Sequence, residues 1–409
     1  MNWRDVGLRS SPIEVRDRIA SLDIIRGFAL FGVFLANMPL FQWPVLKADL
    51  YLYSYEYSTM DNWIRMLFDM FIETKFFSIF SFLFGLGFYI FMSRAEEKGL
   101  RVYRLFSRRL IILALIGLIH LVFFWYGDIL LKYALAGFVL IFFYKRKPKT
   151  ILIWIMTMMI ALIGLIAINF ITPAESVEQL IVEQQAAGSG KIEEMIEVYK
   201  RADYTQWLAY RLTHEIIPVL KDIPYAIITA FFMFLIGLYA GKRGILQYVS
   251  KHLRFIKRSA WITGSIGLPL SIAIMMLYIG VLDYGMLTSI YIQLLTTVSG
   301  PFLSLFYISG IVLLLRSDRW IRWLRPLGFA GRMALTNYLT QTLISVGIFT
   351  GLGLFGTLNL ALGVILCFLI YPLQIAWSSY WLKRYRFGPI EWVWRSLTYG
   401  KFQPMKIEK

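Results

Sequence analysis

The residues best suited to chemistry lie where one apolar stretch of the chain gives way to the next. His120 lies late in the stretch 110–126, Asp128 follows in the turn, and Lys132 comes one helical turn after Asp128. A histidine oriented by a carboxylate is the usual general base for a hydroxyl or amine nucleophile, and it can also relay protons in a transporter. His120 and Asp128 are therefore the candidate catalytic residues, and Lys132 is a structural or relay residue. A purely structural histidine is the alternative.

A second polar set lies in the first apolar stretch. Asp23 and Arg26 are three residues apart and can pair on one face of a helix. Asn37 follows Arg26 by eleven residues, close to three helical turns, so it shares that face. Asp23 is a structural or relay candidate, and Arg26 and Asn37 are candidate binding residues. The alternative is a structural ion pair together with one hydrogen bond between helices.

A third set lies near residues 327–350. Arg332 precedes Asn337 and Gln341, which are four residues apart and share a helical face. Two amides one turn apart can line a polar channel or hold a carbonyl or phosphate group, and they can equally join two helices. These three residues are candidate binding residues.

The composition places these groups in a membrane protein. Of the 409 residues, 58% are hydrophobic and 16% are charged, whereas roughly a quarter of a soluble protein is charged. The mean hydropathy is +0.62. The net charge of +17 would suggest nucleic acid for a soluble protein, but cytoplasmic loops of membrane proteins also collect Lys and Arg. We expect the lipid bilayer as the partner and no nucleic acid.

Ten stretches are apolar enough for a spanning helix, which needs about 20 such residues. They are centred near residues 24–41, 76–92, 110–126, 129–144, 151–171, 223–240, 260–281, 285–315, 327–350 and 355–381. Of the 42 basic residues, 31 fall in the head, the tail and alternate loops, and the remaining loops are net acidic. This bias predicts a multi-pass protein of the plasma membrane with both termini in the cytoplasm.

The expected fold is an all-α polytopic membrane protein. We divide it into an N-terminal five-helix half (1–171), an extracytoplasmic segment (172–222), a C-terminal five-helix half (223–382) and a cytoplasmic interfacial tail (383–409). The second segment has a helical pattern after a Gly-rich break and is predicted to be a small acidic cap. It is either a solvated connector or a lid over an outward cavity.

The rare metal-ligand residues exclude several site classes. Cys367 is the single cysteine and there are three histidines, so we expect no internal disulfide and no Cys-rich or His-rich metal site.

Five short motifs together identify a resemblance. They are residues 18–27 followed by Asn37, then 77–85, 127–130, 331–338 and 388–392. As a set, these motifs resemble the YeiB-like family of bacterial membrane proteins, which carry a C-terminal domain of unknown function. The resemblance extends from about residue 16 to residue 400 and implies the architecture more firmly than an activity.

The opening motif is also similar to that of the heparan-glucosaminide acetyltransferase-like proteins. This similarity implies transfer of an acyl group from a cytoplasmic donor such as acyl-coenzyme A to an extracytoplasmic sugar, glycan or lipid. The donor would be a substrate, and no covalently bound cofactor is implied. His120 would be the general base or acyl relay, with Asp128 as its orienting partner.

The same resemblance gives the binding residues their roles. Arg26 and Arg332 would attract the donor's phosphates, while Asn37, Asn337 and Gln341 would line the acyl path or polarise the thioester carbonyl. Two other classes of function stay open. One is a proton-coupled transporter of a small or lipid-linked molecule, and the other is a noncatalytic membrane scaffold or sensor.

Overall fold

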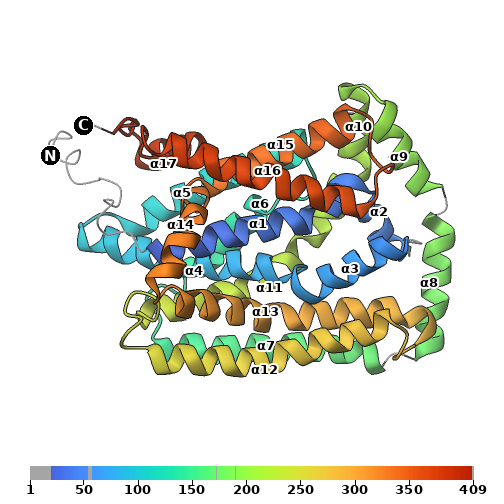
Figure 1. Ribbon diagram of the computed structural model, residues 1–409, viewed down its shortest axis with the longest axis horizontal. Helices are drawn as coiled ribbons and strands as arrows, with labels where there is room; N and C mark the ends of the chain where they lie inside the picture. The colour runs from blue at the N-terminus through green and yellow to red at the C-terminus, as the bar shows by residue number, and fades with distance from the viewer. Residues whose placement is uncertain (1–19, 54–57, 172, 189, 408–409) are drawn as a thin grey trace.

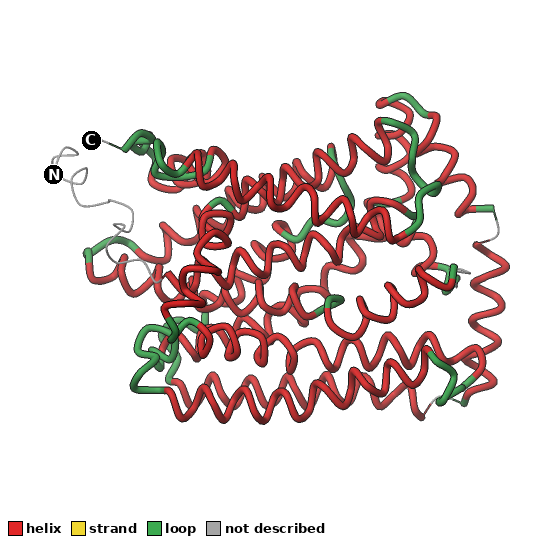
Figure 2. The backbone as a smooth tube through the Cα atoms, viewed as in Figure 1, coloured by secondary structure: helices red, strands yellow, loops and turns green. Residues whose placement is uncertain are grey.

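The structure is a computed structural model that describes residues 20–53, 58–171, 173–188 and 190–407. These residues form helices joined by short connections, and among them no strand occurs beyond an isolated bridge between Tyr385 and Lys406 (Figure 2). The prediction of an all-α protein is confirmed.

The helices alternate between long apolar segments and short connecting ones. The first half of the chain forms α1 (Ala20–Gln42), α2 (Val45–Leu50), α3 (Thr59–Phe71), α4 (Lys75–Glu97), α5 (Val102–Phe123), α6 (Leu130–Ile141), α7 (Pro148–Ile171), α8 (Ala174–Gly188), α9 (Lys191–Arg201) and α10 (Tyr204–His214). The second half forms α11 (Ile216–Lys242), α12 (Leu253–Tyr278), η2 (Gly285–Leu287), α13 (Thr288–Leu314), α14 (Asp318–Arg332), α15 (Ala334–Val346), η3 (Gly347–Gly351), α16 (Leu360–Trp381) and α17 (Pro389–Tyr399).

Most long helices run side by side along the length of the molecule (Figure 1). The short helix α17 lies at one end of this bundle, and α8, α9 and α10 lie at the other (Figure 1). Each end of the bundle therefore has its own short helices, formed by the predicted interfacial tail and the predicted cap.

Seven segments of the described chain are long and apolar enough to cross a membrane. They comprise α1, the pair α3 and α4, then α5, α11, α12, η2 with α13, and α16, while α6 and the first part of α7 are apolar but shorter. The protein is thus a polytopic helical membrane protein. These seven full-length spans of the described chain are fewer than the ten apolar stretches that the sequence predicted.

The ninth apolar stretch, residues 327–350, is not one helix. It is divided between α14 and α15 by Met333, whose φ of −112° and ψ of 32° lie outside the helical region. The expectation of an unbroken span was therefore wrong at this position. Hydropathy could not reveal the break, because the residues on both sides of Met333 remain apolar enough for a span.

Helix α3 is an element that the sequence analysis did not predict. It begins after Ser58, whose hydroxyl accepts a hydrogen bond from the Asp61 N–H, a typical N-terminal cap. It packs against α12, α13 and α16. A turn at Thr74, which has a positive φ of 64°, then separates α3 from α4, so that polar residues of α3 lie inside the bundle.

Glycines allow the central helices to approach closely. A Cβ atom on Gly85 of α4 would lie 2.0 Å from the Phe234 carbonyl oxygen of α11, and one on Gly237 would lie 2.0 Å from the Phe82 carbonyl oxygen. Small residues are the usual means of such contact between membrane helices. Because α4 belongs to the predicted N-terminal half and α11 to the C-terminal half, the two halves pack against each other through this crossing.

We predict that Gly85→Ala destabilises the protein by about 1–3 kcal/mol, because the new methyl group overpacks a backbone contact. The matched control is Gly87→Ala on the same helix, where nothing lies within 4 Å of the added atom. Thermal unfolding of the detergent-solubilised variants measures the difference. Equal melting temperatures for the two variants would show that the α4–α11 contact is not tight.

Candidate functional site

The structure brings His120 and Asp128 together inside the bundle. The His120 Nδ1 and Asp128 Oδ1 atoms are 2.9 Å apart, and the two residues are 2% and 3% exposed. The other Asp128 oxygen accepts a 2.7 Å hydrogen bond from the Leu131 N–H at the start of α6. Asp128 therefore caps α6 and binds the imidazole at the same time, which fixes the orientation of the ring.

The third member of this chain of contacts is Thr342 of α15. Its Oγ1 lies 3.0 Å from the His120 Nε2 atom. Because an ionised carboxylate can only accept, His120 Nδ1 donates to Asp128, and in a neutral ring Nε2 then accepts from the Thr342 hydroxyl. The arrangement leaves the basic lone pair of the ring on Nε2, directed at a hydroxyl group. Thr342 directly follows Gln341, a candidate of the sequence analysis, but 222 residues separate it from His120.

Lys132 does not join this group. Its Nζ atom instead forms a 3.0 Å ion pair with Asp222 of α11. The charge that the spacing placed near Asp128 is thus paired with a residue that lies far away in the sequence.

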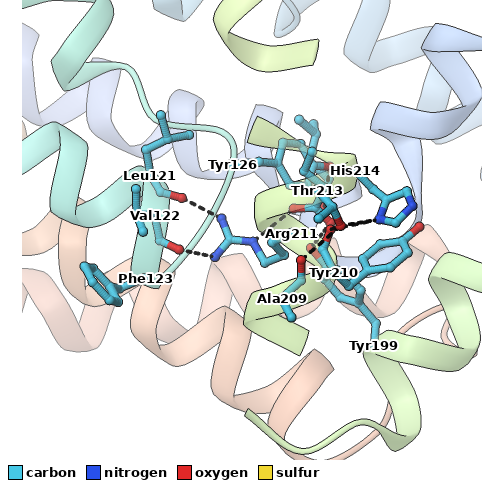
Figure 3. A network of polar contacts seen from close by, with 12 residues as sticks. Leu121, Val122, Phe123, Tyr126, Tyr199, Ala209, Tyr210, Arg211, Thr213 and His214 are labelled. Carbon is cyan, nitrogen blue, oxygen red and sulfur yellow. Dashed lines mark hydrogen bonds and ion pairs between the residues drawn. The ribbon is translucent and has the colours of Figure 1, made fainter. Parts of the chain in front are cut away.

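The end of α5 that carries His120 is held by the predicted cap. Arg211 of α10 donates 2.6 Å and 3.1 Å hydrogen bonds to the carbonyl oxygens of Leu121 and Val122, the two residues after His120 (Figure 3). A cation at the C-terminus of a helix also interacts favourably with the helix dipole. Arg211 therefore fixes the last turn of α5 and, with it, the position of the imidazole.

Arg211 is itself balanced by a buried carboxylate. It donates a 3.0 Å hydrogen bond to Glu215, and both residues are completely buried. Tyr199 donates a 2.6 Å hydrogen bond to the same carboxylate. Burial raises the pKa of Glu215, and the positive charge of Arg211 opposes this shift.

A cavity of about 1270 Å³ lies beside the histidine. Its wall includes Asp128, Trp125 and Tyr338, while His120 lies directly behind them, with its ring 5.3 Å from that of Tyr338. Ile181 and Gln185 of α8 also line the cavity. The segment after α7 thus forms part of the cavity wall at the α8–α10 end of the bundle.

The cavity is also lined by ionisable residues that the sequence analysis missed. Asp69 of α3 accepts hydrogen bonds from Arg65 at 2.9 Å and 3.3 Å, and from the Tyr278 hydroxyl at 2.5 Å. Asp49 and Glu73 line the cavity nearby. The signal in the sequence was the charged residues between the first two apolar stretches, which the sequence analysis assigned to a loop.

The predicted binding residues separate into different places. Asn37 lines the cavity. Asn337 instead donates hydrogen bonds to the Ser378 hydroxyl and the Ala330 carbonyl, and Gln341 donates to Gln374 of α16. In this structure, Asn337 and Gln341 join α15 to α16 and do not reach the cavity wall.

Arg26 and Arg332 lie at the α17 end. Arg26 pairs with Asp23 at 2.8 Å, as the spacing predicted, and its guanidinium lies 3.4 Å from the Gly331 carbonyl oxygen. The Nε atom of Arg332 is buried, and no hydrogen-bond partner for it occurs in the described part of the chain. The positive charges of Arg109 and Arg395 act on each other and on Arg26. An end with several mutually repelling guanidinium groups is suited to an anion.

The carboxylate of Glu391 in α17 binds the N-terminus of α15. Its carboxylate accepts hydrogen bonds from the N–H groups of Leu335 and Thr336, at 2.7 Å and 3.1 Å. A carboxylate at a helix N-terminus satisfies free donors and interacts favourably with the dipole. Burial raises the pKa of Glu391, and the hydrogen bonds from Thr336 oppose this shift.

No group of three or more potential metal ligands occurs among the residues that the structure describes.

Comparison with known proteins gives relatives along nearly the whole chain. Residues 240–401 match a family described as a protein of unknown function, DUF418. A protein named YxaH from Bacillus subtilis (strain 168) is 36% identical, with 96% of this chain and 97% of the relative covered. A 39.9 kDa protein of Bacillus acidopullulyticus is 32% identical over 97% of this chain and 99% of its own length. The YeiB protein of Escherichia coli (strain K12) is 27% identical over 93% of this chain and 96% of its own length. No solved structure gives a significant match.

We predict that Arg211→Met destabilises the protein by about 3–5 kcal/mol, because Glu215 would remain buried without its cation. The double variant Arg211→Met/Glu215→Leu should recover a large part of this loss. Thermal unfolding measures the stability, and hydrogen exchange of α10 and of the last turn of α5 locates the change. A double variant no more stable than the single one would contradict the charge balance proposed for this pair.

The raised pKa of Glu391 predicts a pH dependence. The folded protein holds this proton more tightly than the unfolded chain, so the contribution to stability is complete below the ordinary pKa of 4.5 and is lost as pH rises through the raised value. The wild type should therefore lose stability relative to Glu391→Gln, which keeps an acceptor oxygen but does not titrate, as pH rises above 4.5. Melting temperatures across a pH series test this, with the exposed Glu97→Gln as control. A difference that stays constant with pH would disprove it.

Proposed function

The chain belongs to the YeiB-like family of DUF418 membrane proteins, and from this premise we propose that it transfers an acyl group across the membrane. The observation that carries the proposal is the buried Asp128–His120–Thr342 chain beside the cavity. An imidazole that is oriented by a carboxylate and accepts a proton from a hydroxyl is the arrangement that activates a nucleophile. The resemblance of the opening motif to transmembrane acetyltransferases supports the same reaction.

In the proposed reaction, Nε2 of His120 is the general base. The acceptor's hydroxyl or amine enters from the cavity and takes the position that the Thr342 hydroxyl holds in this structure. It attacks the thioester carbonyl carbon of the donor while His120 removes its proton. The carbon–sulfur bond then breaks, and His120 returns the proton to the sulfur, so that a free thiol leaves.

The donor would enter from the α17 end, which we propose faces the cytoplasm. Arg109 and His120 lie on the same helix, eleven residues apart, so about 16 Å of helix separates the arginine from the imidazole. The guanidinium groups of Arg26, Arg109, Arg332 and Arg395 would bind the phosphates of an acyl-coenzyme A. The thioester on its long flexible arm would then extend along α5 toward His120.

The acceptor would occupy the cavity at the opposite end, which we propose faces the outside of the plasma membrane. The cavity holds about 1270 Å³, more than the roughly 300–1,000 Å³ of most small-molecule sites, and so has room for a sugar or a lipid headgroup. Its wall carries Asn37, and Asp128 connects it to His120. Asn337 and Gln341 would affect the acyl path only indirectly, because they fix the position of α15 against α16.

Activity with acetyl-coenzyme A tests the proposal. Purified protein in detergent should release free thiol from acetyl-coenzyme A when sugar or amine acceptors such as glucosamine are supplied. We expect His120→Ala to lower the rate at least 100-fold, because positioned general bases contribute about that much or more. Asp128→Asn should also reduce the rate. His252→Ala, a histidine at the start of α12 and away from the cavity, is the matched control.

The Thr342→Val variant identifies the nucleophile. If the acceptor attacks directly, the variant should retain the rate within about tenfold. A loss as large as that of His120→Ala, with an acetyl group found on the wild-type protein by intact mass, would make Thr342 the nucleophile and contradict direct transfer. Thiol release that is unaffected by His120→Ala would overturn the proposed catalytic role.

Proton-coupled transport is the second candidate. It is favoured by the observation that Asp128 lines the cavity while His120 does not, as in a relay that passes a proton from the cavity into the protein. Proteoliposomes containing a trapped pH-sensitive dye would distinguish the two. Proton entry that depends on Asp128, without thiol release from acetyl-coenzyme A, would favour transport.

A further inference from the structure

The cavity beside His120 is lined by more negative than positive charge. Five carboxylates and two cations line the cavity: Asp49, Asp69, Glu73, Asp128 and Asp222 against Arg65 and Lys132. At membrane depth, such charges are expensive and are normally paired. The carboxylates without an ion-pair partner therefore indicate that a ligand of this cavity must supply positive charge.

Both cations are already engaged. Arg65 binds Asp69 through two of its nitrogens, and Lys132 pairs with Asp222. The fully buried Lys75 donates to the backbone carbonyl oxygen of Asp69 and is not part of the cavity wall. None of these cations forms an ion pair with Asp49 or Glu73, although the positive charge of Arg65 acts on both carboxylates and that of Lys75 acts on Glu73.

Of these two carboxylates, Glu73 gives the stronger argument for a cationic ligand. Its Oε2 atom is buried and has no hydrogen-bond partner among the residues that the structure describes, although the residue lines the cavity. Leaving a buried acceptor unsatisfied destabilises the folded protein, and does so more strongly for a charged group. A positive charge that a ligand brings into the cavity beside Glu73 would offset part of the cost of this buried carboxylate.

The same wall has apolar and aromatic neighbours. Phe77 and Leu40 line the cavity together with Tyr278, whose hydroxyl is bound to Asp69. A site with two carboxylates and an apolar surround is suited to a compact ammonium group on an apolar body, since the carboxylates fix the charge and the surround buries the rest.

We propose that Asp49 and Glu73 form a binding site for a protonated primary amine of the molecule that occupies the cavity. The site lies on the wall formed by α2 and the α3–α4 turn, apart from His120 and Asp128. This proposal does not depend on acyl transfer at His120. If the protein is a transporter, an amine that it carries would bind to the same carboxylates.

Fluorescence titration of the purified full-length protein with dansylcadaverine, a primary amine on an apolar fluorophore, tests the site. We expect saturable binding at neutral pH that weakens at least tenfold, about 1.4 kcal/mol, in Glu73→Gln. The neutral N-acetyl derivative should bind weakly and equally to both proteins. Its signal measures the nonspecific partition of the fluorophore into the detergent micelle. Glu175→Gln, an exposed carboxylate of α8 that is outside the cavity, should bind the amine as the wild type does.

Thermal unfolding confirms that each variant is folded. If Glu73→Gln does not fold, Asp49→Asn replaces it, because Asp49 is exposed to the cavity and its substitution disturbs no hydrogen bond between side chains. Equal binding of the amine and its acetylated form, or binding unchanged in the folded carboxylate variant, would overturn the proposal.

His120→Ala separates this inference from the proposed function. It should bind dansylcadaverine as tightly as the wild type even where thiol release is lost. Amine binding with no thiol release from the wild type would disprove acyl transfer and leave the amine site intact. Thiol release without carboxylate-dependent amine binding would support acyl transfer and disprove the amine site.

Discussion

The structure depends on one constraint: inside a bundle surrounded by lipid, a polar group is costly unless a partner within the protein satisfies it. The His120 imidazole shows how the fold meets this constraint, because α6 supplies the carboxylate at Nδ1 and α15 supplies the hydroxyl at Nε2. The same requirement explains why Arg211 is acceptable at zero exposure. It satisfies two carbonyl groups at the end of α5 and is neutralised by Glu215. The buried polar contacts therefore hold α5, α6, α10 and α15 in one arrangement.

Close backbone contact makes this arrangement possible. Gly27 and Gly331 bring α1 against α14, where a Cβ atom on either would lie 2.0 Å from a carbonyl oxygen of the other helix. The break at Met333 then lets α15 start anew, with its first N–H groups bound by Glu391. A continuous helix would have no free N–H groups at this point and would leave the carboxylate of Glu391 without these donors. The break therefore joins α17 to the helix that contacts His120.

The two ends of the molecule differ in charge and in shape, which gives the bundle a direction. Guanidinium groups gather near α17, while a large cavity with an excess of carboxylates lies toward α8 and α2. His120 lies behind the cavity wall, on the helix that also carries Arg109. An anionic donor at one end and an amine-bearing molecule at the other would each meet complementary charge. Electrostatics thus supports opposite entry routes that converge at the histidine.

The sequence by itself determined the membrane class, the helical fold, and the local pairs Asp23–Arg26 and His120–Asp128, because hydropathy and helical spacing act over a few residues. It also identified α15 as polar. Only the tertiary structure decided that Thr342 meets His120, that Lys132 pairs with Asp222, and that Asn337 and Gln341 bind α16, since these contacts join residues brought together by helix packing. The break at Met333 and the inward placement of α3 were hidden for the same reason. Average hydropathy records how apolar a stretch is, whereas a helix end depends on which distant side chain is there to bind it.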